Sequence, residues 1–99
     1  MNNVAHVYAM AFLDVSIEDN KIKEYLDEVN QLIDIMNDNP DLMRIMKDYG
    51  LSVDEKKKTI DICFKGKIYE HLLNFIYVIL DNKRGNLLKE IFVDYTRLA

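Results

Sequence analysis

The residues best able to do chemistry here are two histidines and one cysteine, and their spacing favours neither a metal site nor a catalytic centre. His6 and His71 lie far apart, outside any His-x-x-x-His or Cys-x-x-Cys pair that presents two ligands to one metal ion. Cys63 falls on the expected inner face of its helix beside Phe64. This favours a buried structural thiol, because a reactive thiolate needs an electropositive, accessible setting. We therefore expect no catalytic residue, no metal and no cofactor.

The glycines and the charged residues also argue against an enzyme or a nucleic-acid-binding protein. The three glycines stand alone at positions 50, 66 and 85 and form no phosphate-binding loop. The formal net charge of −4 repels a phosphate backbone. The basic run Lys56-Lys57-Lys58 is flanked by acids and is typical of a solvated helix face. No apolar run approaches the ~20 residues that span a bilayer, so we expect no direct membrane insertion.

The elements that must position any functional residue are helices. Only three glycines and one proline punctuate the chain, which favours helices over many short strands. Apolar residues recur at the three- and four-residue intervals of amphipathic helices. The pattern predicts six helices, at about residues 4–17, 21–37, 40–49, 53–65, 68–82 and 87–98. A chain of 99 residues suffices for a single domain, so we expect a compact all-α six-helix bundle.

Capping signals mark several helix ends. Asn2 or Asn3 can cap the first helix, and Asn39 followed by Pro40 is a good start for the third. Ser52-Val53-Asp54-Glu55 has the form of a capping box at the start of the fourth helix. Glycine ends helices in the left-handed conformation, and we expect this at Gly50 and Gly66.

Two of the predicted helices are apolar almost all the way round. Between residues 4 and 17 the polar residues are His6, Asp14 and Ser16, and between 68 and 80 they are Glu70, His71 and Asn74. Such a helix is either central to the fold or exposes an apolar face to a partner. The two helices could form the core alone, or lie side by side and leave a groove for an amphipathic helix.

Five stretches in this order resemble the delta subunit of F-type ATP synthase, the oligomycin-sensitivity-conferring protein of mitochondria. They are Val4-Ala5-His6-Val7-Tyr8-Ala9-Met10-Ala11-Phe12, Asn39-Pro40-Asp41-Leu42, Ser52-Val53-Asp54-Glu55-Lys56, Leu72-Leu73-Asn74-Phe75-Ile76, and Asn82-Lys83-Arg84 with Leu87-Leu88-Lys89-Glu90-Ile91. One turn departs from the family pattern. The family commonly has Gly, Arg and Leu after the Asn, where this chain has Lys83, Arg84 and Gly85, so Gly85 replaces an apolar residue.

The resemblance implies a non-catalytic stator component, peripheral on the cytoplasmic side of the cell membrane as part of the F1 complex. In the family, the N-terminal six-helix domain binds N-terminal helices of alpha subunits on top of the F1 head, in a groove between its first and fifth helices. A second domain binds subunit b of the peripheral stalk. This resemblance leads us to expect that residues 1–99 are the N-terminal domain and that the second domain is missing from this chain.

The groove that the resemblance implies between the first and fifth helices indicates which residues contact the partner. On the first helix Tyr8, Ala11 and Val15 are spaced three and four residues apart, so they share a face. On the fifth helix we place Asn74, Tyr77, Val78 and Asp81 on one face. The alternative for each residue is ordinary bundle core. The alternative function is an all-helical regulatory adaptor that binds a different amphipathic helix.

Overall fold

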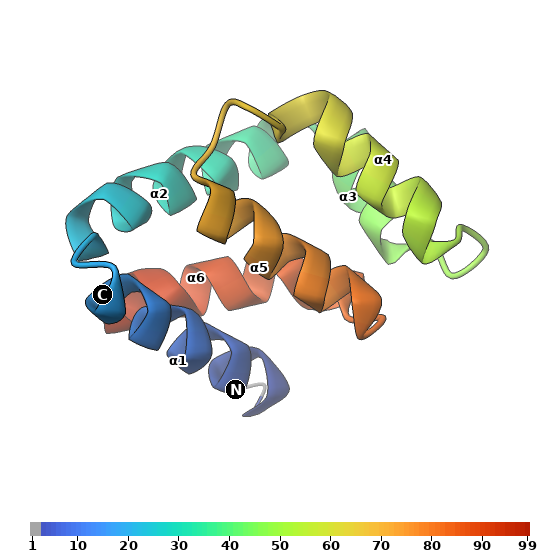
Figure 1. Ribbon diagram of the computed structural model, residues 1–99. Helices are drawn as coiled ribbons and strands as arrows, with labels where there is room; N and C mark the ends of the chain where they lie inside the picture. Colours follow the sequence, from blue (N-terminus) through green and yellow to red (C-terminus); the bar gives the residue numbers. More distant parts are fainter. Residues whose placement is uncertain (1–2) are drawn as a thin grey trace.

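The computed structural model describes residues 3–99 and shows the helices in the predicted order (Figure 1). The α-helices are α1 (Asn3–Glu18), α2 (Ile22–Asp38), α3 (Pro40–Lys47), α4 (Val53–Phe64), α5 (Glu70–Asp81) and α6 (Leu88–Leu98), and a short 3₁₀ helix, η1 (Gly85–Leu87), precedes α6. The described residues contain no strand, and the predicted all-α fold is confirmed. Asn2, the alternative cap for the first helix, lies outside the described residues.

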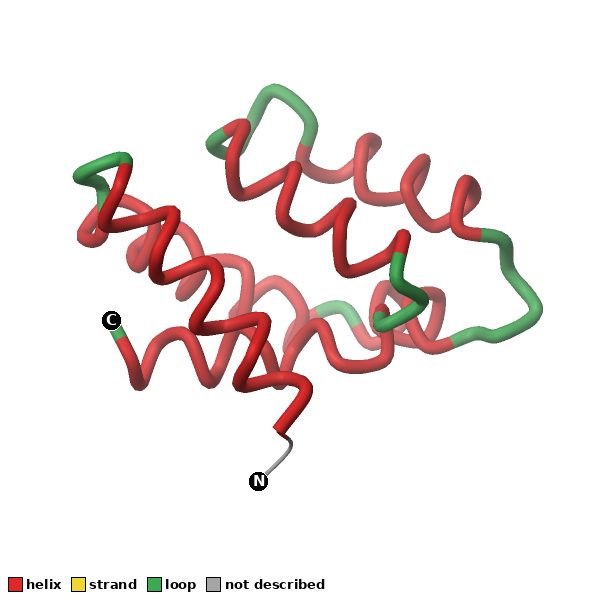
Figure 2. The backbone as a smooth tube through the Cα atoms, turned by 60° about the horizontal axis from the view of Figure 1, so that its bottom comes forward, coloured by secondary structure: helices red, strands yellow, loops and turns green. Residues whose placement is uncertain are grey.

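The centre of the bundle is the contact between α1 and α6, which cross in Figure 2. The buried stripe of α1 consists of Ala5, Ala9, Phe12 and Ser16. Its two alanines leave room for α6, because the distance between packed helices depends on the side chains at the contact. Buried Ser16 donates a hydrogen bond to the Phe12 carbonyl (2.8 Å), and its hydroxyl lies 2.7 Å from that of Tyr95 on α6. The Ser16–Tyr95 hydrogen bond joins α1 to α6 in a fully buried environment.

Phe12 joins four helices through its ring. Its centroid lies 4.6 Å from that of Phe75 on α5, 5.1 Å from that of Tyr95 on α6 and 5.4 Å from that of Tyr25 on α2. Aromatic pairs at such separations contribute about 0.5–1.5 kcal/mol each beyond their burial. The side chain of Phe12 is fully buried, so this ring fixes α1 against the rest of the bundle.

The helix boundaries confirm some capping predictions and correct others. Ser52 accepts a hydrogen bond from the Glu55 amide (3.1 Å), as the capping box predicts, and Gly66 follows α4 with φ of 79°. Asn39 does not cap α3 through its side chain. Its amide instead donates to the carbonyl of Ile35 (2.8 Å) and closes α2. Gly50 is also not left-handed, because α3 has already ended at Lys47 and Asp48 accepts from the Gly50 amide (2.7 Å).

Cys63 is exposed, so the prediction that its thiol is buried was wrong. The buried stripe of α4 runs through Ile60 and Phe64. Because α4 lies at the edge of the bundle, where it packs chiefly against α5, only a narrow face is covered. Position 63 lies beside that face rather than within it.

Gly85 is buried where η1 meets α3, and the close approach of the two backbones requires glycine. A Cβ at this position would lie 2.7 Å from the carbonyl oxygen of Met46 and 3.1 Å from Cδ2 of Leu80. The departure from the family pattern at this turn therefore has a packing consequence. The absent side chain lets η1 pack directly on the end of α3.

Candidate functional site: a groove between α1 and α5

Helices α1 and α5 run antiparallel, and a polar contact joins them at each end. Near the start of α1, Tyr8 accepts a hydrogen bond from the side-chain amide of Asn82, which follows α5 (2.8 Å). Beyond the end of α1, Oδ2 of Asp19 lies 2.5 Å from Nδ1 of His71, in the first turn of α5. The residues from 71 to 82 span about 16 Å of helix, so the surface between the two contacts is about three helical turns long.

The part of this surface nearer the Asp19–His71 contact is hollowed into a groove of about 340 Å³. Its lining combines an aromatic floor with apolar and polar walls: Phe12, Val15, Glu18, Asp19, His71, Asn74, Phe75 and Val78. The stacked rings of Phe12 and Phe75 form the floor. Val78 is 49% exposed although α5 is otherwise one of the most buried helices. The groove therefore offers an apolar surface bordered by polar groups.

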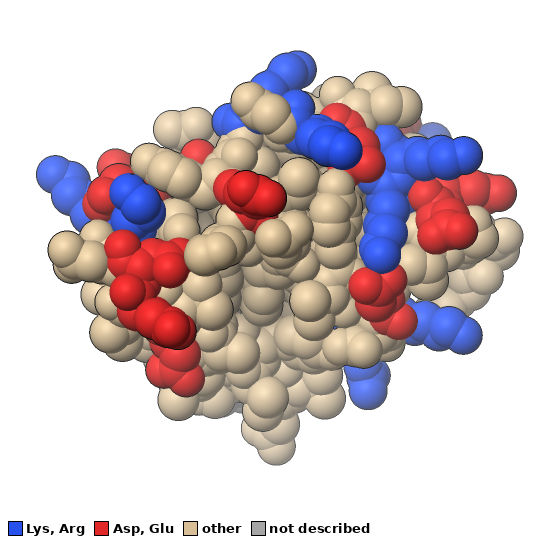
Figure 3. Space-filling model, in the orientation of Figure 1, with Lys and Arg blue, Asp and Glu red and all other residues tan. Residues whose placement is uncertain are grey.

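The face of the molecule over α1 and α5 carries few charged groups (Figure 3). The outer side of α1 adds further apolar surface, since Val7, Met10 and Ile17 are 66%, 45% and 57% exposed. An exposed apolar surface bordered by polar residues is typical of a protein-interaction site. The sequence-based inference from the scarcity of polar residues in these two helices therefore has a structural counterpart.

The charged end of the groove is held by a three-residue cluster. The Tyr25 hydroxyl donates to Asp19 (2.5 Å), and His71 contacts the same carboxyl oxygen. The hydrogen bond from Tyr25, followed by that from His71, lowers the pKa of Asp19. The hydrogen bond to Asp19, followed by its negative charge, raises the pKa of His71. The cluster thus favours an ionised Asp19 and a protonated His71, with exposed Glu18 adding negative charge at this end.

Most residues predicted to contact a partner surround the groove. Val15, Asn74 and Val78 line it. Tyr8 lies at its far end, with its ring 6.5 Å from that of Phe75. Ala11 is exposed on α1 between Tyr8 and Val15. The structure brings these five residues together, and their role in binding stays a prediction.

Tyr77 and Asp81 lie on the flank of α5 that contacts α4, and they do not line the groove. The Tyr77 hydroxyl donates a hydrogen bond to Asp61 of α4. Nζ of Lys57, also on α4, lies 2.5 Å from Oδ1 of Asp81 and 5.4 Å from the centroid of the Tyr77 ring. The spacing of the four α5 residues puts them on one helix face, but α4 packs against the flank that holds Tyr77 and Asp81. Of the four, Asn74 and Val78 line the groove.

Sequence reasoning missed five residues of the groove: Phe12, Glu18, Asp19, His71 and Phe75. A signal for them was present in the spacing. Val15 and Asp19 are four residues apart, as are His71 and Phe75, and such pairs share a helix face. Phe12 and Phe75 pack in or against the core and also lie beneath the groove.

The described residues present neither a cluster of metal ligands nor a membrane-spanning helix. Residues 3–99 contain no group of three or more His, Cys, Asp or Glu side chains arranged to hold a metal ion. In the same part of the chain, no helix has the length and apolar character required to cross a membrane.

The fold and the groove define a small all-helical domain that presents an apolar groove between two antiparallel helices. The chain belongs to the ATP synthase delta (OSCP) subunit family, whose family model matches residues 4–99. It is 39% identical over 83 residues to ATP synthase subunit delta of Clostridium perfringens strain ATCC 13124, which covers 84% of this chain and 46% of that protein. It is 36% identical over 91 residues to ATP synthase subunit delta of Prochlorococcus marinus strain AS9601, covering 92% and 51%. The chain thus spans about half the length of these relatives.

Proposed function

We propose that this domain is a non-catalytic stator component of an F1Fo ATP synthase and that it binds the N-terminal helix of an alpha subunit in the groove between α1 and α5. The observation that carries the proposal is the apolar groove between these helices, in a chain that belongs to the delta (OSCP) subunit family. A stator component must bind its partner subunits tightly, and this role requires no catalytic residue. An exposed apolar surface on a folded helical domain supplies affinity when a partner covers it.

The shape and polarity of the groove specify the kind of helix that fits. An amphipathic helix lays its apolar stripe into such a groove through residues at i, i+3, i+4 and i+7. Val15, Phe75 and Val78 provide the apolar contact, while the exposed amide of Asn74 can bond a polar group at the edge of the stripe. Ala11 is small enough to let a partner backbone come close. Glu18 at one end favours a partner with a basic residue there.

The same proposal assigns the domain its place in the complex. The resemblance to the family implies that a second domain of the delta subunit contacts subunit b of the peripheral stalk. In this arrangement residues 1–99 hold the F1 head, and the second domain connects it to the stalk. The domain then acts on the cytoplasmic side of the membrane, as a peripheral part of the F1 complex.

The substitution Val78→Asp tests the proposal at the centre of the groove. Val78 is half exposed, so a charge there leaves the fold intact while placing an unpaired carboxylate under the partner helix. We expect a loss of about 2 kcal/mol or more, roughly thirtyfold in the Kd for a peptide from the alpha-subunit N-terminus. Isothermal titration calorimetry measures the Kd directly. Ile62→Asp is the matched control, because Ile62 is 81% exposed on α4.

The comparison of these two variants decides the proposal. A peptide that binds the wild-type chain and Ile62→Asp equally, but Val78→Asp much more weakly, supports the groove. Equal binding to all three proteins places the alpha subunit elsewhere. Absence of binding to the alpha peptide, together with tight binding to another amphipathic helix, favours the regulatory adaptor instead.

A further inference from the structure

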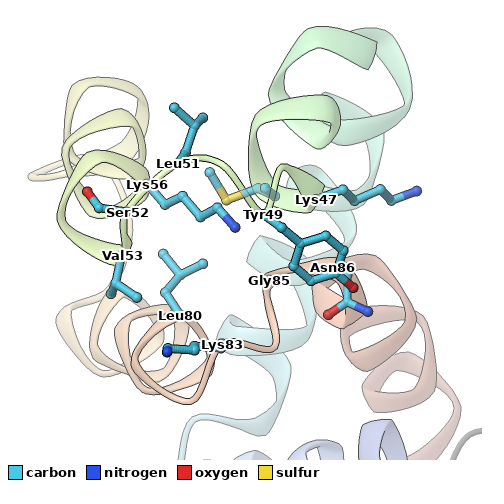
Figure 4. A pocket seen from close by; sticks show the side chains of 11 residues that line it. Lys47, Tyr49, Leu51, Ser52, Val53, Lys56, Leu80, Lys83, Gly85 and Asn86 are labelled. Carbon is cyan, nitrogen blue, oxygen red and sulfur yellow. The ribbon is translucent and has the colours of Figure 1, made fainter.

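A second cavity lies at the end of the molecule where the α3–α4 loop meets the turn after α5. It encloses about 480 Å³ and is lined by the end of α3, the first turn of α4 and the Lys83–Asn86 turn. Its apolar wall includes Val53 and Leu80 (Figure 4). A cavity of several hundred Å³ with an apolar wall and a few polar groups is typical of a small-molecule site. This cavity is separate from the groove, which lies between α1 and α5.

The charge of this cavity is opposite to that of the whole chain. The lining includes three lysines, Lys47, Lys56 and Lys83, and none of the described residues that line it is acidic. The ion pairs that lysine and arginine form in residues 3–99 involve other cations: Lys21, Arg44, Lys57 and Arg97. Three lysines that form no ion pair with a carboxylate thus border one cavity in a chain of net charge −4, and the Lys47 amine points away from it (Figure 4). Lys56, the first residue of the basic run, is half-buried and its side chain points into the cavity (Figure 4).

An aromatic side chain stands at the rim of the same cavity. Tyr49 is 85% exposed, the largest exposed fraction among the exposed large apolar and aromatic side chains of the described residues. In Figure 4 its ring lies near Gly85 and Asn86, while Lys83 lies below Leu80. A free aromatic face can stack with a planar ring, and base–aromatic stacking contributes about 1–3 kcal/mol per base. The cavity thus offers a ring for stacking at its rim and positive charge in its lining, and a single ligand can reach both.

The turn after α5 holds Lys83 in a backbone conformation that lysine disfavours. Lys83 has a φ of 59°, a left-handed conformation that glycine adopts without strain and other residues do not. Glycine is also the residue that the family pattern has at this position. The other departure in the turn, Gly85, lines the cavity as well. Both departures therefore act at the same place: one adds a cation to the cavity and the other removes a side chain from it.

We propose that this cavity binds an organic polyphosphate that carries a planar ring, the chemistry of a nucleoside triphosphate. The phosphates lie between Lys56 and Lys83, where lysine acts as a flexible point charge, and Lys47 stands at the rim with its amine pointing outward (Figure 4). The planar ring stacks on Tyr49, and the apolar wall at Leu80 covers the rest of the ligand. The first amides of α4, next to Ser52, add the positive end of a helix dipole to the same side of the cavity.

Titration of the chain with ATP at low ionic strength, followed by NMR and calorimetry, tests the site. We expect shifts at Tyr49, Lys56, Lys83 and Gly85 and a Kd that rises steeply with salt. Loss of one charge-assisted contact in Lys56→Gln weakens binding about tenfold. Lys58→Gln is the matched control, because Lys58 is exposed on the same helix and does not line the cavity. Val78→Asp, in the groove, leaves ATP binding unchanged, so this test is independent of the proposed function.

Lys83→Gly separates a ligand site from a merely structural lysine. Removing the strained side chain raises the midpoint of urea unfolding, while the loss of a cation weakens ATP binding. Inorganic tripolyphosphate is expected to bind more weakly than ATP because it lacks the ring, and Tyr49→Ala is expected to abolish that difference. The proposal is overturned if ATP does not bind, if Lys56→Gln and Lys58→Gln behave alike, or if phosphatidylglycerol vesicles or an acidic peptide bind through these lysines where ATP does not.

Discussion

Replacing Gly85 with alanine tests how η1 is held against α3. The added Cβ would lie 2.7 Å from the carbonyl oxygen of Met46, and ordinary contact begins at 3.4 Å, so one backbone must move by about 0.7 Å. The second neighbour, Cδ2 of Leu80 at 3.1 Å, blocks part of that movement because Leu80 is itself buried. Overpacking of this kind costs about 1–3 kcal/mol. Alanine also restricts the unfolded chain, which offsets about 0.4–1 kcal/mol.

The expected net result is a loss of about 1–2 kcal/mol in the free energy of unfolding. For a domain of this size that lowers Tm by roughly 5–15 °C. Urea unfolding monitored by circular dichroism measures the change. The matched control is Gly50→Ala, where the nearest neighbour is only the side-chain oxygen of Asp48 at 3.1 Å, and we expect a change within about 0.5 kcal/mol. A Gly85→Ala protein as stable as the wild type would refute the packing argument.

Three further predictions concern bonds that hold the helices. Ser16→Ala leaves the buried Tyr95 hydroxyl without its partner and is expected to cost about 1–3 kcal/mol of unfolding free energy. Adding Tyr95→Phe removes the orphaned hydroxyl, so the double variant loses less than the sum of the single ones in urea titrations. Ser52→Ala removes the cap of α4 and costs about 1 kcal/mol by thermal unfolding. His71 is expected to titrate above 6.5 by NMR, with Asp19→Asn returning its pKa toward that value.

The pH dependence of the Asp19–His71 contact follows from the directions of the two pKa shifts. The pKa of His71 is raised on folding, so its contribution to stability is complete below the unfolded value and is lost as pH rises through the folded value. The pKa of Asp19 is lowered, so its contribution is lost as pH falls through its folded value. The contact is therefore strongest between these two limits. An unchanged His71 titration in Asp19→Asn would contradict the assigned pair.

Controls for the other two predictions come from neighbouring residues. Thr59→Ala lies on the same helix as Ser52, and the Thr59 hydroxyl bonds only the backbone of its own helix, at Glu55. We expect its effect to stay within about 0.5 kcal/mol. Equal losses in Ser52→Ala and Thr59→Ala would rule out a specific role for the cap. Strict additivity of Ser16→Ala and Tyr95→Phe would contradict the buried hydrogen bond.

The sequence predicts the helices well because each leaves a strong local signal. The apolar intervals of α2 and α6, the Ser52 cap and Pro40 at the start of α3 depend on residues only a few positions apart. Asn39 shows the limit of local reasoning. The Asn39 side chain could either cap the start of α3 or bond the end of α2. It bonds the carbonyl of Ile35 in α2, and the residue type alone does not reveal which of the two it does.

The groove could be predicted only in part, because the partition of one helix among several neighbours is a tertiary property. The scarcity of polar residues in α1 and α5 correctly identified both walls. Tyr77 and Asp81 are spaced to share a helix face with Val78, and the sequence does not show that both contact α4 instead of lining the groove. The prediction that Cys63 is buried was wrong for a related reason, since the other helices cover only a narrow stripe of α4.

An NMR titration of the labelled chain with a peptide from the alpha-subunit N-terminus of the same organism tests the central proposal most directly. The proposal predicts shifts clustered on Tyr8, Ala11 and Val15 of α1 and on Asn74 and Val78 of α5, with the outer face of α4 around Ile62 unmoved. Absence of shifts at high peptide concentration, or shifts confined to α3 and α4, would contradict the assignment of the α1–α5 groove as the alpha-binding site.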